Sequence, residues 1–120
     1  MGSSAKRVLV VEDESLVAML IEGYLEELGH EVARTAARLD EALALARTLD
    51  LDVAVLDVNL AGELSYPVAE ALRQRGVPFL FATGYGTAGL PEELRGVPVL
   101  PKPFEQEQLR RAICLAAGDG

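Results

Sequence analysis

The sequence predicts an α/β fold, in which a five-stranded, doubly wound parallel sheet carries helices on both faces. Short, continuous apolar runs, typical of strands buried on both faces, alternate with longer segments whose apolar residues recur at helical spacing. The chain has 120 residues and 50% of them are hydrophobic, which suits one domain with one core. With the strands numbered along the chain, we expect the order 2-1-3-4-5 in the sheet.

The first half of the chain contains three expected strands and two expected helices. Ser15 is a candidate N-cap for the first helix, and Gly29 stands where a helix-ending glycine belongs. His30, the only histidine, follows this glycine and is expected to be exposed. The expected elements are strand 8–11, helix 16–28, an outer strand 31–36, helix 39–49 and strand 53–56.

The second half of the chain contains two more strands and two clear helices. Ser65 is a candidate cap for a helix that tolerates Pro67 in its first turn, and Pro98 indicates an edge strand. Segment 83–89 holds three glycines and is expected to be a loop, so the fourth helix should be short or irregular. The expected elements are helix 66–75, strand 79–82, at most two helical turns at 91–94, strand 97–100 and helix 105–117.

Composition excludes several classes of protein. The net charge of −8 disfavours binding to nucleic acids and to anionic membrane surfaces. Cys114 is the only cysteine, which excludes an internal disulfide and a zinc site built from cysteines. No apolar run has transmembrane length and no signal segment is recognisable, so we expect a cytoplasmic protein. We expect residues 1–5 to be a disordered terminus or a remnant of cloning, and residues 6–118 to be the domain.

Five polar side chains directly follow expected strands. They are Glu12 and Asp13 after the first strand, Asp57 after the third, Thr83 after the fourth and Lys102 after the fifth. Each alone has an ordinary explanation as a helix cap, a turn residue or a surface charge. The carboxyl ends of parallel strands, however, meet at one edge of a sheet, where ligands of this fold class bind. Their gathering at that edge therefore favours a functional site.

The side chains at this edge suit phosphoryl transfer. Clustered carboxylates repel one another unless their pKa values rise or a cation binds, and Mg²⁺ prefers oxygen ligands. The metal and the ammonium of Lys102 would neutralise charge on phosphoryl oxygens, and the hydroxyl of Thr83 would donate to them. The carboxylate of Asp57 would form an acyl phosphate.

These residues resemble the receiver domains of bacterial response regulators in two-component signalling. The matching segments are Val10-Val11-Glu12-Asp13-Glu14, Val55-Leu56-Asp57-Val58-Asn59-Leu60 with Gly62, Ala82-Thr83 and Lys102-Pro103-Phe104. The resemblance covers the chain after residue 5 and implies a CheY-like, flavodoxin-like fold for the domain at residues 6–118. It also implies a cis peptide bond between Lys102 and Pro103.

The resemblance also implies roles for individual residues. Asp57 would be the phosphoacceptor, and Thr83 and Lys102 would bind the phosphoryl group. The implied ligands of Mg²⁺ are Glu12 and Asp13, the former largely through water, with Asp57 and the backbone carbonyl of Asn59. The implied partner is a histidine kinase or histidine phosphotransferase. Such a domain catalyses its own phosphorylation and dephosphorylation and converts no external substrate.

The sequence departs from the common receiver pattern in three places. Ala61 replaces a frequent proline, Val99 replaces the usual aromatic switch residue, and the fourth helix is truncated. With segment 78–86, these departures resemble the single-domain "FAT GUY" subgroup, linked in alphaproteobacteria to partner histidine kinases and general stress signalling. Tyr85 could move in place of the missing aromatic, or it could merely cover the loop.

Other functions compete with this interpretation. A phosphatase of the haloacid-dehalogenase type would need a second acid where Asn59 stands, and a cap domain. A flavodoxin-like cofactor binder would need a phosphate loop where the acids follow the first strand. An adaptor that never carries phosphate would not need all five polar residues. The chain could also be one domain of a longer regulator.

Overall fold

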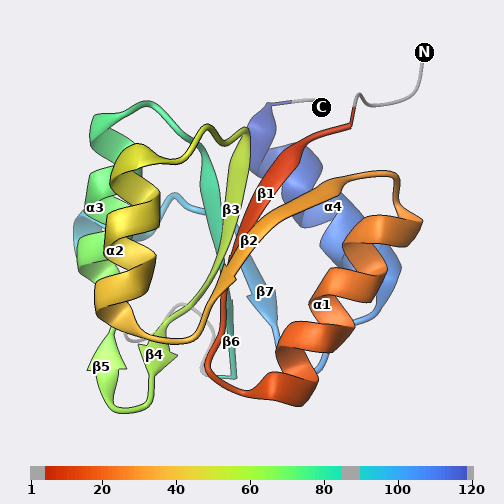
Figure 1. Ribbon diagram of the computed structural model, residues 1–120, viewed down its shortest axis with the longest axis horizontal. Coiled ribbons are helices and arrows are strands. Elements are labelled where there is room, and N and C mark those ends of the chain that lie inside the picture. The colour runs from red at the N-terminus through yellow and green to blue at the C-terminus, as the bar shows by residue number, and fades with distance from the viewer. Residues whose placement is uncertain (1–4, 85–89, 119–120) are drawn as a thin grey trace.

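The computed structural model describes residues 5–84 and 90–118 and shows a five-stranded parallel sheet in the order β2-β1-β3-β6-β7 (Figure 1). This is the order 2-1-3-4-5 predicted from the sequence. The strands are β1 (Arg7–Val11), β2 (Glu31–Ala36), β3 (Val53–Asp57), β6 (Phe79–Thr83) and β7 (Val99–Pro101). Because all five run in the same direction, their carboxyl ends share one edge of the sheet, at the bottom in Figure 1. We call this the carboxyl edge.

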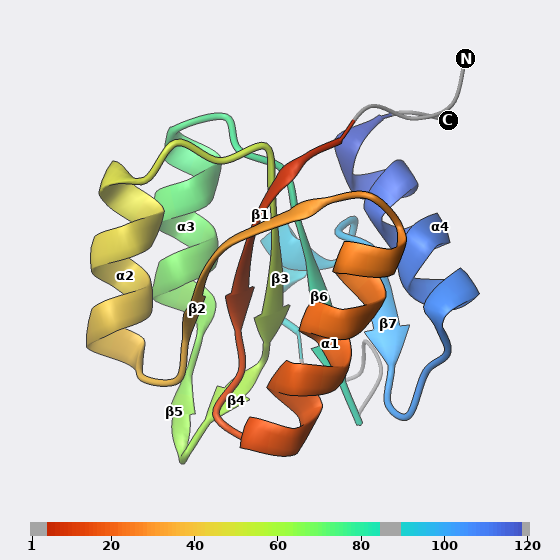
Figure 2. The ribbon, with the colours of Figure 1, turned by 45° about the vertical axis from the view of Figure 1, so that its right-hand side comes forward.

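Helices cover both faces of the sheet, with α2 and α3 on one face and α1 and α4 on the other (Figure 2). The α-helices are α1 (Ser15–Glu27), α2 (Leu39–Thr48), α3 (Tyr66–Gln74) and α4 (Gln106–Ala117). The expected short fourth helix is a single 3-10 turn, η1 (Glu92–Leu94). Among the described residues, no helix combines the length and apolar character needed to cross a bilayer.

Alternation along the central strands divides the core into two layers. In β1, Leu9 and Val11 face α2 and α3, whereas Val8 and Val10 face α1 and α4. These four side chains are at most 1% exposed. Burying each apolar side chain contributes about 1.5–3 kcal/mol. The layers therefore fix which side of each of these strands faces which helices.

Three local expectations were wrong. Ser15 lies within α1, and Glu14 is the N-cap residue. Ser65 does precede α3, but its buried hydroxyl has no hydrogen-bond partner and does not cap the helix. His30 is buried rather than exposed, and its Nδ1 accepts a hydrogen bond of 3.1 Å from the backbone N–H of Lys6.

The connection after β3 also differs from the expected loop. It contains a short antiparallel hairpin of β4 (Asn59–Leu60) and β5 (Glu63–Leu64), which projects at the carboxyl edge (Figure 1). Ala61 and Gly62 connect the two strands with φ angles of 51° and 93°. Two consecutive left-handed residues are the signature of a type I′ turn, whose twist suits a two-residue hairpin.

Candidate functional site

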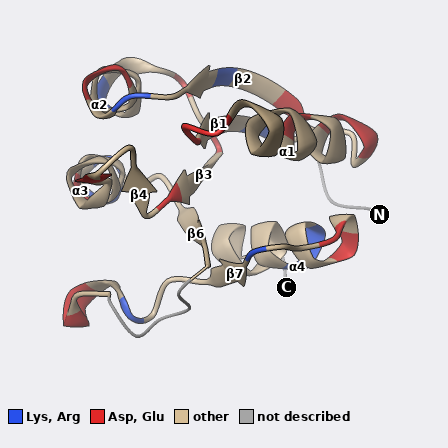
Figure 3. Cartoon of the chain, turned by 90° about the horizontal axis from the view of Figure 1, so that it is seen from below, with Lys and Arg blue, Asp and Glu red and all other residues tan. Residues whose placement is uncertain are grey.

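The carboxyl edge brings together the carboxylates of Glu12, Asp13 and Asp57, which we call the acid cluster. Glu12 and Asp13 follow β1, and Asp57 is the last residue of the neighbouring strand β3. One carboxylate oxygen from each residue lies within 4.8 Å of the other two. Figure 3 looks onto this edge and shows acidic segments at the ends of β1 and β3, with a basic segment after β7. The predicted convergence of the three acids is therefore present.

Lys102 supplies the positive charge of the site. Its Nζ lies 2.7 Å from Oε1 of Glu12 and 3.4 Å from Oδ2 of Asp57, so one ammonium bridges two carboxylates. The backbone N–H of Lys102 donates to the carbonyl of Thr83 over 3.0 Å, and the peptide bond to Pro103 is cis, as expected. The connection after β7 therefore directs Lys102 back over the edge of the sheet.

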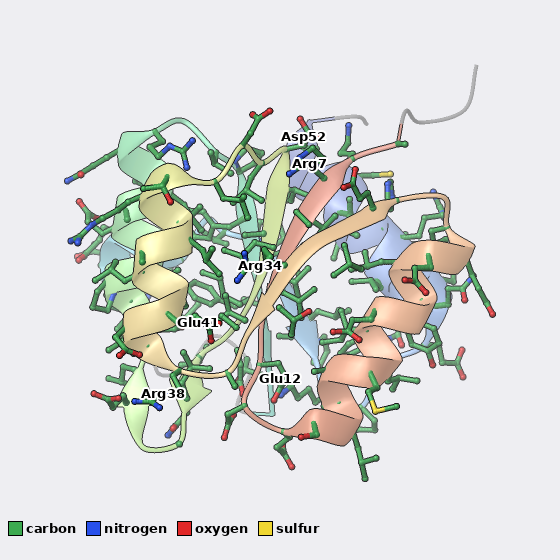
Figure 4. The ribbon with its side chains drawn as sticks, in the orientation of Figure 1. Arg7, Glu12, Arg34, Arg38, Glu41 and Asp52 are labelled. Carbon is green, nitrogen blue, oxygen red and sulfur yellow. The ribbon has the colours of Figure 1, made fainter. Side chains whose placement is uncertain are left out.

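Glu12 is the most deeply buried member of the acid cluster. Its side chain is 0% exposed, and Figure 4 shows the residue at the lower end of β1. Its second carboxylate oxygen accepts a hydrogen bond of 3.2 Å from the backbone N–H of Glu14. Both oxygens therefore have partners, as a buried carboxylate requires.

Burial and repulsion shift the protonation of the phosphoacceptor candidate. Burial, followed by the negative charge of Glu12, raises the pKa of Asp57 from 3.8 to about 7, although the charge of Lys102 opposes the shift. Burial lowers the pKa of Lys102, but its hydrogen bond to Glu12 and the charges of both acids outweigh burial and raise that pKa overall. A single ammonium thus does not relieve all the repulsion among the acids.

The chemistry of the acid cluster fits a divalent cation. The ligand atoms are carboxylate oxygens, which Mg²⁺ prefers, and they are close enough to share one ion. Burial and the neighbouring charge of Glu12 both disfavour the ionised form of Asp57 and raise its pKa, and a bound cation would offset both effects. The residues present are therefore suited to hold Mg²⁺.

Thr83 and Asn59 flank the phosphoacceptor candidate. Thr83 is 2% exposed and ends β6, one residue beyond Ala82, which pairs with Asp57. Asn59 begins β4, and its backbone N–H donates to Oδ1 of Asp57 over 3.4 Å. All the predicted site residues therefore lie at the carboxyl edge, whereas Tyr85 lies outside the described residues.

The hairpin explains why the proline that is frequent at this position in receiver domains is absent here, where Ala61 stands. A proline ring holds φ near −65°, which is incompatible with the φ of 51° at Ala61. We expect Ala61→Pro to destabilise the protein by about 1–3 kcal/mol, because the turn must be rebuilt. Ala61→Asn should stabilise it by about 0.5 kcal/mol, because asparagine tolerates left-handed φ better than alanine.

Urea unfolding of the two Ala61 variants beside the unaltered protein measures both effects. Equal stability of Ala61→Pro and the unaltered protein would show that the left-handed turn is not needed for the native state.

Comparisons with known proteins agree with the fold. Residues 8–114 match the family model described as the response regulator receiver domain. The sensory transduction protein LytR of Staphylococcus saprophyticus is 32% identical over 111 residues, which cover 89% of this chain and 44% of LytR. The chain thus spans less than half the length of LytR.

Solved structures show the same similarity. SdrG from Sphingomonas melonis Fr1 superposes with a TM-score of 0.83 at 42% identity, covering 94% of this chain and 97% of SdrG. The receiver domain of PhyR from Erythrobacter litoralis gives a TM-score of 0.77 at 30% identity, covering 94% of this chain and 90% of that domain.

Proposed function

Since the chain belongs to the response regulator receiver domain family, we propose that it accepts a phosphoryl group on Asp57 in a magnesium-dependent reaction. The donor would be a histidine kinase or a histidine phosphotransferase. The observation that carries this proposal is the position of Asp57, which lies 3.4 Å from the ammonium of Lys102 and beside the acids that follow β1.

The site residues divide the work of phosphoryl transfer. A carboxylate oxygen of Asp57 attacks phosphorus and the bond from phosphorus to a nitrogen of the donor imidazole breaks. The imidazole leaves as a neutral ring, because its other nitrogen already carries a proton. Lys102 and Thr83 would hold the phosphoryl oxygens. Mg²⁺, when bound, would neutralise charge on the phosphoryl group. Its proposed ligands are Asp13, Asp57 and the carbonyl of Asn59, with Glu12 acting largely through water.

A protein donor must reach Asp57 across the carboxyl edge. The first half of α1 begins at that edge and presents three exposed apolar side chains at helical spacing. Leu16, Met19 and Leu20 are 81%, 64% and 46% exposed. This apolar face supports a protein as the donor, because such residues are more usual at contacts than on free helix surfaces.

The neighbouring structures support a response to phosphorylation. A second structure of SdrG, 40% identical to this chain with a TM-score of 0.80, is described as its BeF3-activated conformation. A PhyR structure with 32% identity is described as a stress response regulator. We propose that this chain also has an activated conformation, that it signals through protein contacts that change on phosphorylation, and that it converts no external substrate.

Incubation with acetyl phosphate and Mg²⁺, followed by intact mass measurement, tests the proposal without knowledge of the kinase. We expect one added phosphoryl group, and none in Asp57→Asn or when EDTA removes the metal. Asp52→Asn is a matched control, because Asp52 is an exposed acid whose carboxylate binds the backbone N–H of Arg7, away from the site. Equal labelling of Asp57→Asn and the unaltered protein would refute the proposal.

A further inference from the structure

The side chain of Asn59 makes a hydrogen bond that is separate from the proposed role of its backbone carbonyl as a metal ligand. Its Oδ1 accepts a hydrogen bond of 2.7 Å from the backbone N–H of Gly62, across the turn of the β4–β5 hairpin. This is shorter than the usual N–H···O distance of about 2.9–3.0 Å. The same residue pairs with Leu64 in the hairpin and donates its backbone N–H to Asp57.

Asn59 is therefore held from two directions. Its side chain is tied to the turn, and its backbone is tied to the phosphoacceptor carboxylate. A movement of the hairpin turn would therefore also move the backbone N–H of Asn59 relative to the carboxylate of Asp57.

We infer that Asn59, through its side-chain amide, positions the backbone groups of the metal and phosphoryl site. By closing the turn onto Gly62, it fixes the peptide groups on either side of Asn59, one of which donates to Asp57 and the other of which carries the proposed metal-binding carbonyl. The hairpin turn contains no proline ring to restrain its backbone, so its rigidity depends on hydrogen bonds such as the one between Asn59 and Gly62. The inference rests on the proposed function of the site.

The variant Asn59→Ala removes the acceptor and leaves the N–H of Gly62 without its partner. We expect the dissociation constant for Mg²⁺ to rise about three- to tenfold, which corresponds to the loss of one net hydrogen bond. The amide proton of Gly62 should exchange faster with solvent. Asn59→Asp keeps a carboxylate oxygen in the same place, so it should restore slow exchange at Gly62 and at least the original Mg²⁺ affinity.

Leu64→Ala is the matched control, because Leu64 pairs with Asn59 across the hairpin, is 49% exposed and leaves the bond to Gly62 intact. Mg²⁺ binding is measured by titration calorimetry, amide exchange by NMR and overall stability by urea unfolding, for all variants and the unaltered protein. We expect Leu64→Ala to bind Mg²⁺ normally.

The outcomes separate the two proposals. If the unaltered protein binds no Mg²⁺, the proposed function fails. If it binds Mg²⁺ and Asn59→Ala binds it equally well, only the positioning role is overturned. If Leu64→Ala weakens binding as much as Asn59→Ala does, the hairpin acts through its overall stability and the assignment to the amide is wrong.

Discussion

Replacing Lys102 with methionine is expected to slow phosphorylation by acetyl phosphate about 100- to 1000-fold, the usual effect of removing one electrostatic stabiliser from a reaction centre. Methionine keeps most of the apolar stem of lysine and removes the charge, together with its hydrogen bond to Glu12. The ammonium lies 3.4 Å from the carboxylate of Asp57, where the phosphoryl oxygens would arrive. The rate is followed by intact mass at saturating Mg²⁺.

Two controls distinguish the effect of the lost charge on the phosphorylation rate from an effect of unfolding. Arg110→Met removes a cation on the exposed face of α4, where its guanidinium binds Glu107, and should leave the rate unchanged. Urea unfolding in Mg²⁺ confirms that Lys102→Met is folded at the assay temperature. A folded Lys102→Met protein that is phosphorylated at the normal rate would exclude Lys102 from the chemistry.

The second large effect is a gain of stability on removal of the phosphoacceptor charge. In magnesium-free buffer at neutral pH, we expect Asp57→Asn to raise the free energy of unfolding by about 2 kcal/mol. The pKa of Asp57 rises from 3.8 to about 7 in the native protein, which would correspond to roughly 4 kcal/mol if the whole shift were recovered. The smaller figure allows for relaxation of the native site and for penetration by water, which reduce the cost of a buried charge.

The pH dependence of this gain has a definite sign. Unfolded Asp57 loses its proton near pH 3.8, whereas native Asp57 keeps it until about pH 7. Between these pH values the unfolded state binds fewer protons, so the unaltered protein loses stability relative to Asp57→Asn as pH rises. Above pH 7 the difference should be constant.

Urea unfolding of both proteins in EDTA, at pH 5 and pH 8, measures this difference. Added Mg²⁺ should reduce the difference in free energy of unfolding, because the ion stabilises the unaltered protein more than Asp57→Asn, which lacks one proposed ligand. If the two proteins have the same free energy of unfolding in EDTA at both pH values, the charge of Asp57 does not destabilise the native acid cluster.

The sequence was sufficient to predict the topology because the central strands are continuous apolar runs, which indicates burial on both faces of the sheet. The apolar runs before Glu12 and before Asp57 are typical of strands buried on both faces, and segments with helical spacing of their apolar residues separate the strands. Parallel strands then bring their following residues to one edge. The gathering of Glu12, Asp57 and Lys102 follows from this topology without knowledge of any side-chain position.

The sequence was insufficient where a short segment depends on tertiary contacts. The hairpin after β3 was expected as a loop, because its two strands have two residues each and its turn has Ala61 where asparagine or aspartate would signal a type I′ turn. The burial of His30 accompanies a hydrogen bond from the backbone N–H of Lys6, which is 24 residues away in the chain. Neither feature has a period or a motif that a sequence pattern could reveal.

Mapping the phosphorylated residue tests the central proposal most directly. After labelling with acetyl phosphate and Mg²⁺, borohydride reduces an aspartyl phosphate to homoserine, and peptide mass spectrometry then locates the change. We predict conversion at Asp57 alone, and none when EDTA is present during labelling. Conversion at another acid, with Asp57 intact in the labelled protein, would contradict the assignment of the phosphoacceptor.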